Sequence, residues 1–235
     1  MAKPKDDRIL FTEHVLEIRH AAVGLFLDVR GHVADYIRQE GFFPHWKIDS
    51  NVVNFRDESD AMKIEGAFVG YKSAGYVALN PKTRNYFVDR ASSFWKGLIK
   101  NKHYNIPIPK RFGTRTKFFF PLTDSFDEIN NTIYKAFFTD TARKLVGGQE
   151  TDLQFTIDLQ EEGFGIRVIG GPIKKDEADR YFQFEAEEFG KCGIYLDMDY
   201  FKTENISLQD VPKLLKKADA LAWQKAEQIT TGLGY

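Results

Sequence analysis

A regular alternation between Leu153 and Gln160 limits the possible folds of this chain more than any other feature. The side chains of a β-strand point alternately to its two faces, so the alternation predicts a half-buried strand. Glu161-Glu162-Gly163 predicts a turn into a second strand that begins at Phe164. Strands joined by short turns form antiparallel sheets with one face against other elements. The apolar members of the alternation are Leu153, Phe155, Ile157 and Leu159.

Shorter patterns predict the remaining elements. Apolar-rich runs predict strands at residues 15–27, interrupted near Gly24, and at 46–48, 52–55, 62–64, 76–79, 114–122, 181–187 and 193–201. Apolar residues at helical spacing predict helices at 33–39, at 84–100 and from 211 to a stop at Gly232. Ser125 and Glu128 have the spacing of a capping box, which predicts the start of a further helix.

The order of these elements predicts an α+β fold built from two similar halves. Each half has a strand, a helix, a meander of strands and a closing helix, with antiparallel sheets and helices packed on one face. We expect residues 1–9 to form a loose N-terminal tail, 10–110 the first half and 111–235 the second half. The two halves would pack as one compact unit, and sheets joined edge to edge would be continuous.

Composition narrows the class of protein. The chain has 43% apolar and 29% charged residues, as an ordinary globular protein does. No apolar run approaches the roughly 20 residues of a membrane helix, and the charged start of the sequence does not resemble a secretory signal. Cys192 is the only cysteine, which excludes an internal disulfide. These features predict a cytoplasmic protein with no membrane partner, and no motif predicts a cofactor.

A basic span from Lys82 to Lys117 is the clearest functional signal. It holds ten Lys or Arg residues and one acid, Asp89, with aromatic residues between them. Residues 1–120 carry 20 Lys+Arg and 13 Asp+Glu (+7), whereas residues 121–235 carry 13 and 21 (−8). Phosphates and acidic protein surfaces both bind such cations, and structural use of the aromatic residues is the competing interpretation. The predicted binding residues are Lys96, Lys100, Lys110, Arg111, Arg115 and Lys117.

Asp197 and Asp199 form the most suggestive acidic pair. Residues two apart on a strand lie on one face, where two carboxylates can hold Mg²⁺. The surrounding string, IYLDMDYF, is similar to the metal-binding strand of lesion-bypass polymerases. Those proteins place the string at the start of a large palm domain and need further carboxylates, whereas here a predicted helix follows it. An amphipathic strand with exposed aspartates is the structural interpretation of the same pattern.

Several short motifs together resemble a set of sporadically distributed, uncharacterised prokaryotic proteins of about this length. The motifs are Trp46 to Asp49, Gly75 to Phe94, Arg111 to Arg115, Ile194 to Asp199 and the closing helix. The resemblance covers most of the chain. It implies a two-part α+β protein often encoded by mobile-element or defence genes, and it supplies no catalytic residues.

The predicted function is therefore non-catalytic binding or assembly through the basic surface near residues 82–117. A protein partner or a second copy of the chain is the expected ligand, and nucleic acid is an alternative. The competing hypothesis is a Mg²⁺-dependent enzyme on nucleotides or nucleic acid that uses Asp197 and Asp199.

Overall fold

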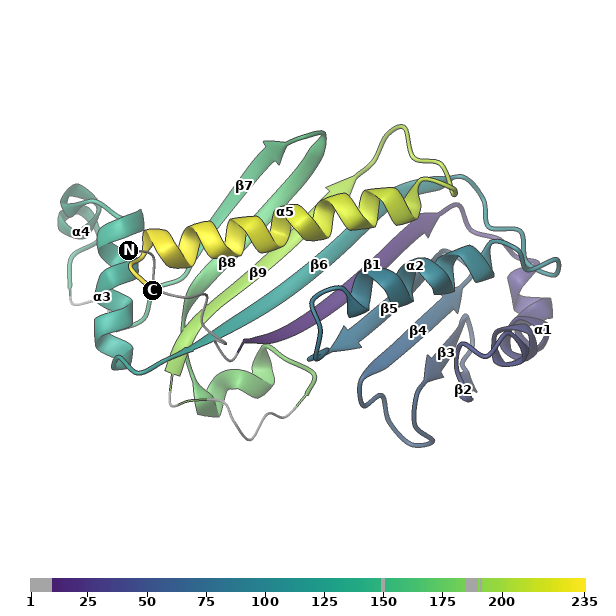
Figure 1. The fold of residues 1–235 in the computed structure, drawn as a ribbon. Coiled ribbons are helices and arrows are strands. Elements are labelled where there is room, and N and C mark those ends of the chain that lie inside the picture. The colour runs from purple at the N-terminus through teal and green to yellow at the C-terminus, as the bar shows by residue number, and fades with distance from the viewer. Residues whose placement is uncertain (1–9, 149–150, 185–189, 191) are drawn as a thin grey trace, which may run out of the picture.

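Nine strands pair into one antiparallel sheet in the computed structural model, which describes residues 10–148, 151–184, 190 and 192–235 (Figure 1). From one edge to the other, the strands are β2 (His45–Ile48), β3 (Val52–Arg56), β4 (Glu65–Gly70), β5 (Ser73–Leu79), β1 (Phe11–His20), β6 (Pro109–Leu122), β9 (Cys192–Lys202), β8 (Phe164–Lys174) and β7 (Phe155–Glu161). Strand β1 pairs with β5 on one side and β6 on the other, so it joins segments far apart in the sequence. The sheet is continuous across the middle of the chain.

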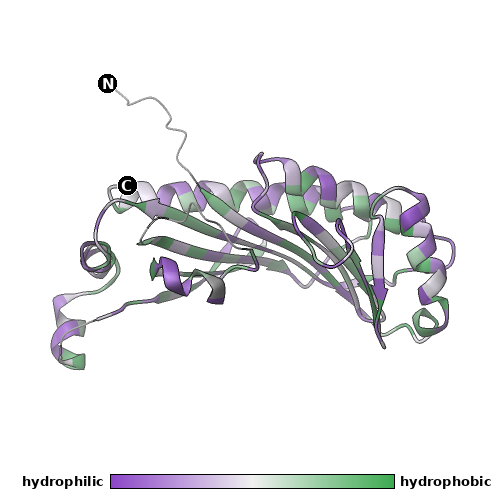
Figure 2. Cartoon of the chain, turned by 90° about the horizontal axis from the view of Figure 1, so that it is seen from below, coloured by the Kyte–Doolittle hydropathy of each residue, from purple (hydrophilic) through white to green (hydrophobic). Residues whose placement is uncertain are grey.

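Two helices lie along one side of this sheet, as Figures 1 and 2 show. They are α2 (Tyr86–Leu98) and α5 (Val211–Gly232), which contact each other as well as the strands beneath them. The other helices are α1 (Phe26–Gln39), α3 (Phe126–Phe137), α4 (Asp140–Val146) and a short 3₁₀ helix, η1 (Lys175–Arg180). We call the face of β1, β6 and β9 that packs against α2 and α5 the covered face, and the opposite face the open face.

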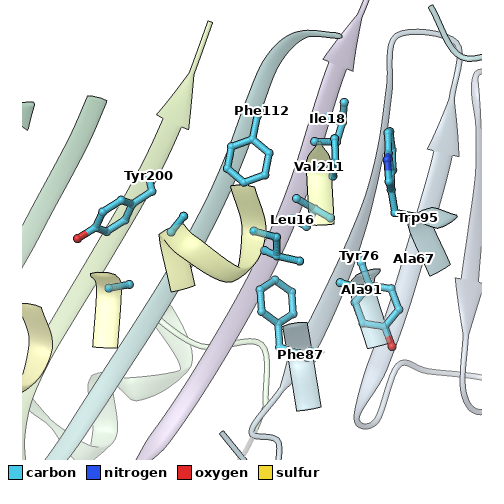
Figure 3. Packing of buried hydrophobic residues seen from close by; sticks show 14 of the residues in the cluster. Leu16, Ile18, Ala67, Tyr76, Phe87, Ala91, Trp95, Phe112, Tyr200 and Val211 are labelled. Carbon is cyan, nitrogen blue, oxygen red and sulfur yellow. The ribbon is translucent and has the colours of Figure 1, made fainter. Parts of the chain in front are cut away.

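The main hydrophobic core lies between the covered face and these two helices. Leu16, Phe112 and Tyr200 project from β1, β6 and β9, and Phe87 of α2 and Val211 of α5 lie over the sheet (Figure 3). All five side chains are buried. Because apolar burial is the dominant favourable term in folding, this layer fixes how the strands and helices sit together.

A second, smaller core lies on the other face, beside η1. It consists of Phe11, Phe119, Ile173, Ala178, Phe182 and Tyr195. Phe119 and its neighbour Phe118 point to opposite faces, since Phe118 contacts Trp223 of α5 whereas Phe119 contacts Phe182. The segment around η1 therefore covers one end of the open face.

The predicted α+β class is confirmed, as are several elements. The helix predicted at 84–100 is α2, the closing helix is α5, and the hairpin predicted at Glu161–Gly163 joins β7 to β8. The capping box at α3 is present: the Ser125 hydroxyl accepts from the Glu128 N–H, and the Glu128 carboxylate accepts from the Ser125 N–H at 2.8 Å. These elements have strong local signals.

Three predicted strands were wrong in whole or in part. The run at 15–27 ends as a strand at His20, and α1 begins at Phe26. Residues 62–64 form no strand, and β4 begins at Glu65. Residues 181–184 are irregular, while 185–187 lie outside the described part of the chain, as does the predicted tail at 1–9. Among the described residues, every helix is too short or too polar to span a membrane.

Candidate binding surface on the open face

The alternation of side chains along β6 places three of the predicted cations on one face of the sheet. Thr116 lies on the covered face, where its hydroxyl is 3.2 Å from His14 Nδ1. Arg111, Arg115 and Lys117 occupy the alternate positions and lie on the open face. Three of the six predicted cations are therefore brought together there.

Arg115 forms the best-defined contact of this group. Its Nε donates to Asp197 Oδ1 at 2.7 Å, and its Nη2 donates to the other carboxylate oxygen. The Tyr195 hydroxyl donates a third hydrogen bond to Asp197, at 3.1 Å. The hydrogen bonds that Arg115 donates to Asp197 raise the pKa of its guanidinium above the usual value, although burial opposes this effect. Asp197 is thus held in a bidentate ion pair, a geometry that orients both partners.

Lys117 forms the most enclosed pair. Its Nζ lies 2.6 Å from Glu13 Oε1 on β1, and it also donates to the Tyr181 carbonyl at 2.6 Å. The second oxygen of Glu13 accepts from the Gln183 N–H at 2.7 Å. Because these contacts tie β1 and β6 to the segment after η1, this pair has a structural role at the covered end of the open face.

Arg111 bridges the acids of the two neighbouring strands. Its Nη2 donates to Asp199 of β9 at 2.9 Å, and its Nη1 lies 3.8 Å from Glu17 of β1. The guanidinium carbon lies 5.3 Å from the ring centre of Phe201. A Cβ on Gly113 would lie 2.2 Å from Arg111 Nη1, so the glycine leaves room for the guanidinium. Burial raises the pKa of Asp199, and the nearby arginines oppose this effect.

The row of charges extends onto β8 and β7. Arg167 of β8 makes two hydrogen bonds to Asp158 of β7, at 2.8 and 3.0 Å. At the other side of the row, Arg19 of β1 donates to Glu17 of the same strand at 2.8 Å. We call the whole set the charged ladder. Its members are Glu13, Glu17, Arg19, Arg111, Arg115, Lys117, Asp158, Arg167, Asp197 and Asp199.

A groove of about 770 Å³ adjoins the charged ladder beside the β7–β8 hairpin. Asp158 and Arg167 line it together with the aromatic side chains of Phe164 and Phe201. Lys202 and Glu204, from the end of β9 and the loop after it, add charge on the same groove. The groove combines an apolar lining with charged side chains, as binding sites commonly do.

The other three predicted cations lie elsewhere. Lys96 is exposed on α2, Lys100 is exposed just after that helix, and Lys110 is exposed near the start of β6. Their side chains make no ion pair with any described residue, in contrast to Arg111, Arg115 and Lys117. The six predicted residues therefore do not form one continuous basic patch.

Asp197 and Asp199 share one face, as their spacing predicts, and each is paired with an arginine. A cation at this position would have to displace or rearrange these arginines. In the part of the chain that the structure describes, no group of three or more His, Cys, Asp or Glu side chains is arranged to hold a metal ion.

The acidic partners on β1 were missed in the sequence. Glu13 and Glu17 lie four residues apart in FTEHVLEIRH and so share one face of β1, as the cations do on β6 and the aspartates do on β9. The sequence signal for these partners is that two strands carry acids on one face and a third strand carries cations on one face. It becomes informative only once β6 is known to lie between β1 and β9.

No protein-family model matches the chain, and no curated protein matches it in sequence.

Proposed function

We propose that this chain is a non-catalytic binding protein that recognises a protein surface of mixed charge through the charged ladder and the adjoining groove. The observation that carries the proposal is that the ladder cations are already paired with carboxylates. Nucleic-acid backbones bind most strongly to cations that are free to neutralise phosphates. A protein surface with acids and bases of its own can instead exchange partners with the more exposed ladder cations, Arg19, Arg115 and Arg167.

The residue types on this face also favour a protein partner. Arginine and aromatic residues are enriched in protein interfaces. Arg111, Arg167 and Phe201 provide these groups next to the groove, and Phe201 and Arg167 line it. Because the ion pairs hold the arginines in place, less side-chain entropy is lost when a partner binds.

We also propose that the two predicted halves are topological duplicates that meet at β1 and β6. In this interpretation β1, β5 and β4 correspond to β6, β9 and β8, and α2 corresponds to α5. The element order and the order of strands from the centre outward support it. The charged ladder would then cross the junction of the halves. The packing of the α-helices on one face, the cytoplasmic location and the mobile-element or defence setting stay predictions.

A charge-reversal pair provides a direct test. Asp158→Arg combined with Arg167→Asp keeps the ion pair and the net charge while reversing the polarity that a partner meets. The exposed pair Asp35 and Arg38 on α1 offers a matched control through the same double exchange. Quantitative affinity purification from the native host should recover a partner with the wild type and the control, and lose it with the ladder variant. Light scattering above the 27.1 kDa monomer mass would identify a second copy as that partner.

Electrophoretic mobility shifts with DNA and RNA at two salt concentrations test the opposite outcome. The proposal expects no shift at low salt. A shift that weakens steeply with salt would show that the cations are available to phosphates, and would overturn the proposal in favour of nucleic-acid binding. Equal loss of partner in the ladder variant and the control would also overturn it.

A further inference from the structure

A second, smaller pocket of about 200 Å³ lies where the segment after β5 passes the start of β1 and reaches α5. Thr12 of β1, Trp223 of α5 and the consecutive residues Lys82, Thr83 and Arg84 line it. This pocket is separate from the charged ladder and shares no lining residue with the groove.

The turn that presents these residues is fixed to the sheet. Asn80 has a φ of 42°, in the left-handed region, and its N–H donates to the Thr12 carbonyl at 2.7 Å. Pro81 follows and restricts the backbone further. The loop from Lys82 to Arg84 therefore leaves the sheet in a defined direction, and α2 begins directly after it at Tyr86.

Both cations of the pocket are accessible to a ligand. Lys82 is exposed and makes no ion pair with any described residue. The Arg84 guanidinium carbon lies 4.8 Å from the ring centre of Trp223, which holds it over the pocket wall. Its contact with Glu227 is long, at 3.4 Å, and both side chains are at least half-exposed. Exposed pairs of this kind contribute little, so an anion can compete for Arg84.

Polar groups complete the lining. Thr12 and Thr83 contribute hydroxyls, which donate readily to phosphate oxygens. The volume is below the roughly 300 Å³ at which pockets for drug-sized ligands begin, which limits the occupant to a small group.

We propose that this pocket binds a phosphate-sized dianion, either free phosphate or the phosphate of a monoester whose remainder projects into solvent. Lys82 and Arg84 would neutralise the charge, and Thr83 would donate a hydrogen bond. The proposal is independent of protein binding at the charged ladder.

Isothermal titration calorimetry of the full chain with inorganic phosphate and with O-phosphoserine tests the pocket. The wild type should show saturable binding of at least one of the two, and the one that binds identifies the source of the phosphate. Lys82→Gln with Arg84→Gln should weaken binding about tenfold or more, because charge-assisted hydrogen bonds are the strong ones. Thr83→Val keeps both cations and should give a smaller loss.

The matched control is Lys96→Gln with Lys100→Gln, which removes the same charge from exposed positions. It should bind as the wild type does, and far-ultraviolet circular dichroism checks that each variant is folded. Three results would overturn the proposal: no saturable heat with either probe, equal weakening in the control, or unchanged affinity in the Lys82 and Arg84 double variant.

Discussion

Ionisable side chains on the two faces of the central strands have opposite environments. On the open face, Arg115 and Asp197 are both charged partners in a bidentate pair. On the covered face, His14 lies 3.9 Å from Asp219 of α5, and His14 Nε2 and Asp219 Oδ1 have no hydrogen-bond partner among the described residues. The two environments are separated by the thickness of one sheet.

The helices account for this difference. His14 is fully buried and stacks on Phe87 of α2 at 4.8 Å between ring centres. Burial disfavours the charged form of each group, so it lowers the pKa of His14 to about 3 and raises the pKa of Asp219 to about 7. Arg115 is half-exposed on the open face and keeps its charge next to Asp197. On these central strands, Arg115 is therefore kept charged where it is paired and half-exposed, whereas burial between the sheet and the helices disfavours the charged forms of His14 and Asp219.

The largest effect should come from neighbouring apolar residues of β1. Leu16 is buried on the covered face, whereas Val15 is only partly buried on the other face. Leu16→Ala should lower the free energy of unfolding by about 4 kcal/mol, because it removes apolar burial and leaves a cavity. Val15→Ala should cost about 1 kcal/mol. Urea denaturation measures both values. Similar costs for the two variants would contradict the assignment of the core to the covered face.

Breaking one ion pair should have a somewhat smaller effect. Arg115→Met leaves the buried carboxylate of Asp197 without its counter-ion and should cost about 3 kcal/mol. Adding Asp197→Leu removes the uncompensated charge, so the double variant should recover most of the loss. Urea denaturation of the single and double variants gives the coupling. If Arg115→Met is as stable as the wild type, the ladder does not stabilise the fold.

Local signals predicted the elements that depend on their own sequence. The alternation before Glu161 and the capping box at Ser125 contain the information for β7 and α3 in a few neighbouring residues. The failures arose where apolar residues stay exposed. Leu25 is apolar, so the pattern includes it in the strand predicted at 15–27. In the structure Leu25 is 59% exposed and directly precedes α1. The pattern at 62–64 predicts a strand that includes Ile64, but the N–H groups of Lys63 and Ile64 donate to the Asp57 carboxylate in a loop.

The sequence predicts the cations of the candidate site but not their pairing with carboxylates. Arg111, Arg115 and Lys117 follow from the basic span and from the period of a strand. Their carboxylate partners come from β1 and β9, roughly 80 to 100 residues away in each case. Pairing of such strands depends on tertiary packing, and a single sequence carries no local signal for it. For the same reason, the sequence could not distinguish free cations from paired ones.

The smallest expected effect is on the pH dependence of the free energy of unfolding, and it is specific to His14 and Asp219 on the covered face. As pH falls from 6.5 toward 3, an unfolded His14 takes up a proton that the folded state excludes, so stability falls. As pH falls from 7 toward the ordinary aspartate value of 3.8, folded Asp219 takes up a proton that the unfolded state does not, so stability rises. The two contributions have opposite signs and should largely cancel in the wild type between pH 6.5 and pH 4.

Asp219→Asn removes only the contribution of Asp219, which raises the free energy of unfolding as pH falls. Relative to the wild type, this variant should lose about 2 kcal/mol between pH 6.5 and pH 4, with allowance for residual contact of Asp219 with solvent. His14→Gln removes the other contribution and should gain stability over the same range. Urea denaturation at several pH values, taken as variant minus wild type, cancels the titration of all other groups. Parallel profiles for the three proteins would show that the helices do not shift these two pKa values, and the contrast between covered and open charges would then have to come from pairing alone.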